Sequence, residues 1–198
     1  DWLSVINELQ NYLSLSQKPD PQNWLKAQFM LGRAYEEQGQ LSKATRAYTR
    51  YLASFTTNPL KDLTDLSETF ERLVKISTKA TETNQREMLN LLSAIAAMDH
   101  PESVASEFKY LTAVAGAKNA QNNLAINWLD SVSGNANTSE TKARSQQFRA
   151  LMAIKDKNWE TAEKLLSEIP RIDAISQKTK DSATIALARV QIKLKKNN

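Results

Sequence analysis

The amino-acid sequence predicts an all-α protein. Apolar residues recur at spacings of three and four along almost the whole chain, as on one face of an α-helix. Strict alternation of apolar and polar residues over the length of a strand is scarce. The 198 residues include only 4 Gly and 5 Pro, which leaves long stretches without helix breakers. The pattern divides into ten helical segments.

The first three helices are predicted in the segment that ends at residue 59. One apolar stripe defines the first helix and consists of Trp2, Val5, Ile6, Leu9, Tyr12 and Leu13. Pro19 and Pro21 are expected to break the chain before a second helix at 23–38. Gly39 separates this helix from a third, whose apolar positions run from Leu41 to Leu52.

The other helices follow from the same periodicity and from their end signals. Asn84 and Glu87 predict a capping arrangement at the start of one helix, and Pro101 suits the first turn of the next. Asn158 is expected to cap the ninth helix. The predicted ranges are 64–79, 84–98, 101–116, 120–132, 140–154, 158–170 and 180–195.

Composition narrows the classes of function. The chain has no cysteine, which excludes disulfides and zinc sites built on sulfur. Its net charge is +4, but acidic residues are interspersed with basic ones, as in the segment 68–75, so we interpret the charge as a solvated surface rather than a nucleic-acid site. No apolar run reaches the roughly 18 residues that a membrane span needs.

The predicted helices repeat one another. The segments that begin at Asp1, Gln40 and Asn158 each place a polar residue before a large apolar one, with a small or β-branched residue three positions later. The small or β-branched residues are Val5, Ala44 and Ala162. Helices of this kind start near 1, 40, 84, 120 and 158, and such a period is typical of a solenoid of helical hairpins.

The segment 25–58 resembles a tetratricopeptide repeat. With Leu25 as its first position, the residues on signature positions are Leu31, Gly32, Tyr35, Gly39, Leu41, Ala44 and Tyr48. Gln28 takes the place of the usual aromatic near the fourth position. A weaker unit covers 143–170, with Ala150 at the glycine position. Between 60 and 134 only the period agrees, so that region could also form a HEAT-like pair, and its number of repeats stays open.

The resemblance implies one domain over 1–198, a right-handed superhelix of antiparallel helical hairpins. It also implies that Gly32 lies where two helices approach closely and that Ala44 offers a small surface from the other side, because a larger side chain would push the helix axes apart. We expect Gly32, Ala44 and Ala162 to be buried. The tryptophans, at packing positions, are expected in the core and are Trp2, Trp24, Trp128 and Trp159.

The first helix aligns with the second helix of a hairpin. We therefore expect the chain to be a fragment of a longer protein, with a partner helix upstream of residue 1. Part of the apolar stripe of the first helix would then lack cover, and the stripe could also mediate homo-oligomerisation.

The sequence predicts no enzyme activity, no cofactor and no metal. His100 is the single histidine, and we expect it beside a helix N-terminus rather than in a metal site or a general-base role. There is no glycine-rich phosphate loop and no Gly-x-Ser-x-Gly nucleophile motif.

In the resembled family the concave face, lined by the first helix of each hairpin, binds ligands. The matching positions here are Lys26, Phe29, Arg33, Glu36 and Glu37 in one unit, and Arg144, Gln147, Leu151, Ile154 and Lys155 in the other. Phe29 would be an apolar anchor, and Lys26 with Arg33 could engage an acidic or C-terminal peptide. The Lys and Asn of the family's carboxylate clamp are replaced by Phe29 and Arg33, so that clamp is not expected.

We therefore expect a non-catalytic scaffold that binds a protein or peptide partner. The segment 48–55 resembles bacterial cell-envelope members that help assemble outer-membrane or Tol-type complexes. A chain without cysteine suits the periplasm and the cytoplasm equally, so both compartments stay open. One alternative is an accessory superhelical domain of a larger cell-wall lytic enzyme. Another is a basic helical solenoid that binds RNA, which would lose affinity steeply with salt.

Overall fold

The computed structural model describes residues 1–15, 20–54, 64–77, 79, 82–132 and 138–197. Within these residues every regular element is a helix. The bounds are α1 Trp2–Ser14, α2 Pro21–Glu37, α3 Leu41–Ala53, α4 Thr64–Ser77, α5 Glu82–Ala96, α6 Glu102–Lys118, α7 Asn122–Asp130, α8 Ser139–Lys155, α9 Trp159–Glu168, the 3₁₀ turn η2 Ile169–Arg171 and α10 Gln177–Asn197. No described helix is long and apolar enough to cross a membrane.

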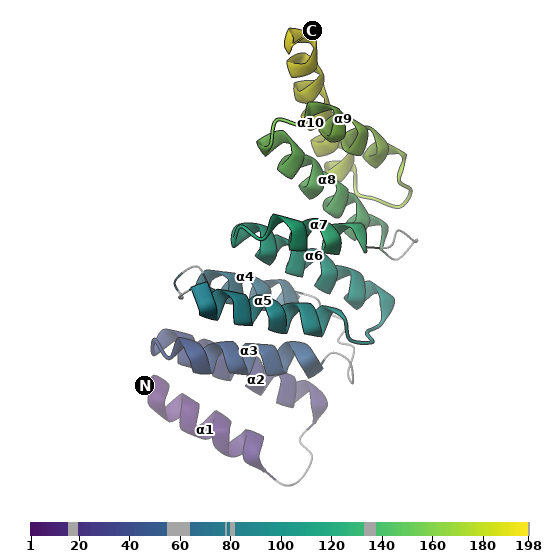
Figure 1. Ribbon diagram of the computed structural model, residues 1–198. Coiled ribbons are helices and arrows are strands. Elements are labelled where there is room, and N and C mark those ends of the chain that lie inside the picture. Colours follow the sequence, from purple (N-terminus) through teal and green to yellow (C-terminus); the bar gives the residue numbers. More distant parts are fainter. Residues whose placement is uncertain (16–19, 55–63, 78, 80–81, 133–137, 198) are drawn as a thin grey trace. The chain divides into compact units, whose positions relative to one another are not determined.

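The chain divides into two units, the first made of residues 1–105 and 118–120 and the second of 106–117 and 121–198. In the first unit α2 packs between α1 and α3, and α3 also contacts α4 and α5 (Figure 1). Asp20 caps α2 by accepting a hydrogen bond from the backbone N–H of Asn23. Pro21 therefore opens the helix, where its missing N–H is harmless, instead of breaking the chain.

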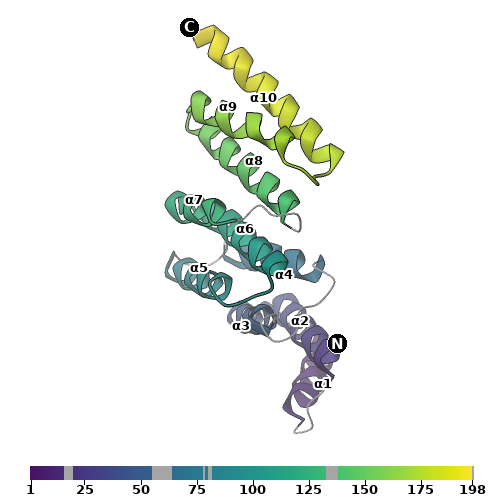
Figure 2. The same cartoon turned by 90° about the vertical axis from the view of Figure 1, so that its right-hand side faces the viewer.

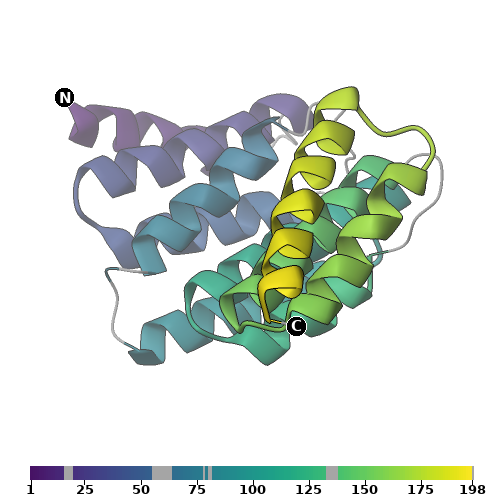
Figure 3. The same ribbon diagram turned by 90° about the horizontal axis from the view of Figure 1, so that it is seen from above.

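In the second unit α8, α9 and α10 pack together (Figure 2). The long α10, yellow in Figure 3, lies against both α9 and α8. Ala183 and Val190 of α10 join a core with Ala143, Ala150 and the buried residues of α9. Asn158 caps α9 by accepting from the N–H of Thr161 at 3.2 Å, as predicted.

Three hairpins of the chain share the length of their first helix and the same turn. The pair α6 and α7 begins 81 residues after α2 and α3, and the pair α8 and α9 begins 118 residues after them. The first helix of each pair has 17 residues. The turn that follows places Gly39, Ala120 or Lys157 in the left-handed region, with φ of 69°, 58° and 60°. The next residue then donates its N–H to a carbonyl five positions earlier in each case.

Small buried residues recur at the crossings of these hairpins. Gly32, Ala113 and Ala150 occupy one repeat position, and all three are buried. The facing position holds Ala44, Ala125 and Ala162, each of which is completely buried. A large apolar residue follows four positions later in each hairpin, as Tyr48, Leu129 and Leu166. The predicted burial of Gly32, Ala44 and Ala162 is therefore confirmed.

The predicted helix positions agree with the structure to within a few residues, and two other expectations are corrected. Asn84 lies inside the first turn of α5, which begins at Glu82, so it is not the cap. Trp2 is 42% exposed and is not a core residue, while Trp24, Trp128 and Trp159 are half-buried. Pro19, Asn58 and Pro59, expected to end or separate helices, lie outside the described residues.

Candidate ligand-binding groove

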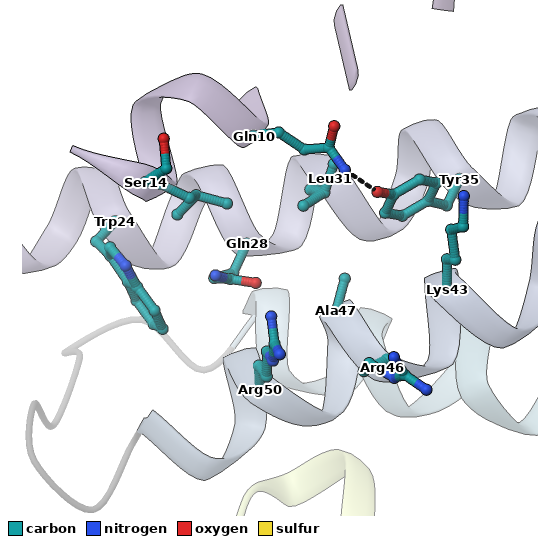
Figure 4. A pocket seen from close by; sticks show the side chains of 11 residues that line it. Gln10, Ser14, Trp24, Gln28, Leu31, Tyr35, Lys43, Arg46, Ala47 and Arg50 are labelled. Atoms are coloured by element: carbon teal, nitrogen blue, oxygen red, sulfur yellow. Dashed lines mark hydrogen bonds between the residues drawn. The ribbon is translucent and has the colours of Figure 1, made fainter. Parts of the chain in front are cut away.

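A groove of about 600 Å³ lies between α1, α2 and α3 in the first unit (Figure 4). We call it the first-unit groove. Its lining residues come from all three helices and are Gln10, Leu13, Ser14, Trp24, Gln28, Leu31, Tyr35, Lys43, Arg46, Ala47 and Arg50.

Helical spacing explains why these side chains share one groove. Trp24, Gln28, Leu31 and Tyr35 are three or four residues apart, so they form one stripe along α2. On α3, Lys43, Arg46 and Arg50 follow the same spacing and form a basic stripe. The two stripes border the same groove because α2 and α3 pack as an antiparallel hairpin, and α1, which also packs against α2, completes its lining.

One end of the first-unit groove is held by hydrogen bonding and a cation–π contact. The side-chain amide of Gln10 donates to the hydroxyl of Tyr35 at 2.6 Å, which links α1 to α2 (Figure 4). The ammonium group of Lys43 lies 5.5 Å from the centre of the Tyr35 ring. Both contacts fix the position of the Tyr35 ring.

All charged residues that line the first-unit groove are basic. Lys43, Arg46 and Arg50 line it, and none of its lining residues is acidic. Arg46 and Arg50 are exposed, and no carboxylate of the described residues pairs with either. The groove therefore presents positive charge that the described part of the chain does not neutralise.

Gln28 is the polar residue most deeply buried in the lining. It is 4% exposed, and its carbonyl oxygen Oε1 has no hydrogen-bond partner. A buried amide without a partner costs about 1–3 kcal/mol of stability. In Figure 4 the Arg50 side chain extends from α3 toward this amide.

The second unit has a groove of its own, about 490 Å³ in volume, between α7, α8 and α9. We call it the second-unit groove. Both acidic residues of its lining have partners there: Asp130 forms a salt bridge with Arg149, and the Glu168 carboxylate accepts from Nε2 of Gln146 at 3.0 Å. The acids that the first-unit groove lacks are thus present here.

The two grooves occupy the same place in the repeating hairpin. Gln146 lies 118 residues after Gln28, which is the spacing that relates α8 and α9 to α2 and α3. Both glutamines have an Oε1 atom that is buried and has no partner. By the same spacing Glu168 corresponds to Arg50. The repeat therefore keeps the amide and exchanges the carboxylate of one groove for a guanidinium in the other.

The residues predicted for the concave face of the first unit lie on the opposite side of α2 from this groove. Lys26, Arg33 and Glu37 are exposed there. Phe29 is only 8% exposed and packs against the rings of Tyr48 and Tyr51, so it cannot serve as an accessible anchor.

Glu36 is tied into an internal network. Its Oε2 accepts from the Tyr48 hydroxyl and from Arg72, both at 3.0 Å, and Arg72 also pairs with Glu68. Burial, and then the bond to Glu36, raise the pKa of Tyr48. Burial opposes the charge of Arg72, but the hydrogen bonds to Glu68 and Glu36 outweigh it and raise the pKa. Glu36 thus stabilises the fold between α2, α3 and α4.

The residues predicted for the second unit also divide into engaged and exposed ones. Arg144 pairs with Glu107 at 3.1 Å and lies 4.2 Å from the centre of the Tyr110 ring. Gln147 donates to Ser182 of α10 at 2.7 Å. Leu151 and Lys155 are exposed, and Ile154 packs against the core of this unit.

His100 is buried, its Nε2 lies 2.7 Å from the carbonyl oxygen of Ile95, and it stands two residues before α6, as predicted. Among the described residues no cluster of three or more His, Asp or Glu could hold a metal ion.

Sequence reasoning did not find the first-unit groove. The signal was present as Gln28 at a position where the resembled family has an aromatic, together with cations at 43, 46 and 50. Comparison with protein-family models, curated proteins and solved structures finds no match to this chain.

Proposed function

We propose that this protein is a scaffold of tetratricopeptide-like helical hairpins, wound as a right-handed superhelix, that binds a protein or peptide. The observation that carries the proposal is the recurrence of one hairpin at spacings of 81 and 118 residues. Each copy has a 17-residue first helix, a left-handed turn residue and a small residue at the crossing. Stacked copies of such a unit present extended surfaces to partners.

The grooves support a binding role over a purely structural one. Each is formed by three successive helices, and each contains a glutamine whose buried amide oxygen has no partner. Proteins rarely leave such groups without partners, because the desolvation cost is not recovered. An incoming peptide offers N–H groups and side chains that can recover it.

Affinity purification from the native organism, followed by mass spectrometry, tests the proposal. The chain is the bait, and a basic protein of similar size without helical hairpins is the control bait. We expect a protein enriched only by the chain, and direct binding of the purified partner in calorimetry. Retardation of RNA at low salt that disappears with added salt, without any direct protein partner, would contradict the proposal.

A further inference from the structure

We propose that the first-unit groove binds an acidic peptide segment of a partner protein, with one carboxylate of that segment held between Gln28 and Arg50. This inference rests on the proposed binding function and names the chemistry of the ligand. The groove lies on one side of α2, and Lys26 and Arg33, the residues predicted from the sequence to bind an acidic peptide, lie on the opposite side.

The second-unit groove shows how such a carboxylate can be held. There Glu168 accepts a hydrogen bond from Nε2 of Gln146. Gln28 is the repeat equivalent of Gln146, and no described residue bonds to its amide. Arg50 takes the place of Glu168, so the first unit offers both the amide and a guanidinium to an external carboxylate.

The spacing of the cations fits a peptide better than a single small anion. Lys43 and Arg50 are seven residues apart on α3, which is roughly 10 Å along the helix axis. In an extended segment, side chains on the same face are about 7 Å apart, so two or three acidic residues within a few positions can reach the basic stripe. Such a segment can pair with several cations at once.

Apolar lining residues supply the rest of the contact. Leu13, Trp24, Leu31 and Ala47 also border the groove, and Trp24 is half-buried. They suit an apolar side chain placed between the acidic ones. The expected ligand is therefore an extended segment in which acidic and apolar residues alternate.

Fluorescence anisotropy can test this with a defined probe. The probe is a short fluorescein-labelled peptide in which glutamates alternate with leucine and serine, and the control peptide has glutamine in place of each glutamate. We expect the intact chain to bind the acidic peptide and to bind the control at least about tenfold more weakly. Equal binding of both peptides would overturn the proposal.

Matched variants locate the site. Arg46→Glu with Arg50→Glu reverses two charges in the groove, and Lys26→Glu with Arg33→Glu makes the same charge change on the opposite face of α2. The first pair should weaken binding about tenfold or more, and the second less than about twofold. Equal losses would mean that only net charge matters, which would overturn the proposal. Because the four residues are exposed, all variants should fold, and melting curves are the check.

Gln28→Leu tests whether the Gln28 amide binds the carboxylate of the peptide. Leucine keeps most of the volume and removes an amide that has no partner, so the fold should be retained. We expect weaker binding of the acidic peptide, and unchanged binding would overturn the role of Gln28.

Further outcomes separate this inference from the proposed function. A partner whose binding depends on Lys26 and Arg33 but not on Arg46 and Arg50 would leave the scaffold function standing and overturn the groove assignment. Failure of every peptide and of every captured protein to bind would overturn both. Displacement of the acidic peptide by single-stranded RNA at lower concentration than by unlabelled peptide would assign the basic stripe to nucleic acid instead.

Discussion

The ring of Tyr48 occupies the space that a side chain at Gly32 would need. A Cβ built on Gly32 would overlap the ring and lie 2.5 Å from Cδ1. Tyr48 is completely buried, and its hydroxyl is bonded to Glu36, so the ring cannot move aside without breaking that contact. At the close helix approach that the resemblance implied, the residue that requires Gly32 is therefore Tyr48.

Gly32→Ala should destabilise the protein. Alanine gains about 1 kcal/mol of helix propensity, but overpacking a filled core costs about 1–3 kcal/mol. The free energy of unfolding, measured by denaturant titration, should fall.

Gly116→Ala is the matched control for this variant. A Cβ at Gly116 meets its nearest neighbours at 3.5 Å, an ordinary contact distance. Because only the propensity gain remains, this variant should be as stable as the original or up to about 1 kcal/mol more stable. Equal destabilisation by both substitutions would contradict the account of Tyr48.

The helices could be predicted from the sequence because their signals are local. Apolar spacing, Gly39 and the cap at Asn158 act within one or two turns, and the helix positions follow from them. The hairpin of α6 and α7 was not assigned as a full copy because its signature residues differ. It has Ala113 where the best unit has Gly32, and Gly116 where that unit has Tyr35.

The groove could not be predicted because it depends on contacts between distant residues. Gln10 and Tyr35 are joined across 25 positions, and Arg72 reaches Glu36 across 36. Periodicity alone places Glu36 and Phe29 on a face of α2, but it does not say which neighbouring helix covers that face.

Tyr48 should make the protein sensitive to alkaline pH. Burial and the bond to Glu36 raise its pKa in the folded state, whereas in the unfolded chain it titrates near its ordinary value of about 10. The contribution of Tyr48 to the free energy of unfolding is therefore complete below about pH 10. It is lost as the pH rises through the raised pKa of the folded state.

Tyr48→Phe tests this directly. The free energy of unfolding of the variant should be about 1 kcal/mol lower at neutral pH, because the hydrogen bond to Glu36 is removed. Its stability should then decline less steeply than that of the original between about pH 10 and 11 in denaturant titrations. Parallel declines would show that Tyr48 does not titrate as argued.

The three hairpin crossings should respond alike to a larger side chain. Ala44, Ala125 and Ala162 share one repeat position and are completely buried, so leucine at any of them must displace the facing helix. Each substitution should lower the free energy of unfolding by about 1–3 kcal/mol. Ala94→Leu, at an exposed position of α5, is the control and should change stability by less than about 0.5 kcal/mol. A tolerated leucine at one crossing would show that this hairpin packs differently from the others.

Glu140 should control the acid sensitivity of α10. Its carboxylate accepts hydrogen bonds from the backbone N–H of Ser176 at 2.8 Å, from the Ser176 hydroxyl at 3.1 Å and from the hydroxyl of Thr179. Burial works against the charged form, but these hydrogen bonds outweigh it and lower the pKa of Glu140. Because the folded pKa is lowered, the stabilisation is present above the ordinary value of about 4.3 and is lost as the pH falls below it.

Glu140→Gln separates this effect from general acid denaturation. At pH 7 the variant should be less stable than the original and should show faster amide hydrogen exchange in the first turn of α10, because Ser176 and Thr179 lose one of the two acceptor oxygens and the charge of the carboxylate. The difference should shrink as the pH falls toward about 3, because the protonated carboxyl of the original then resembles the amide. Gln177→Ala, which leaves the Glu140 contacts in place, is the control. A stability difference that stays constant from pH 7 to pH 3 would mean that the charge of Glu140 does not anchor α10.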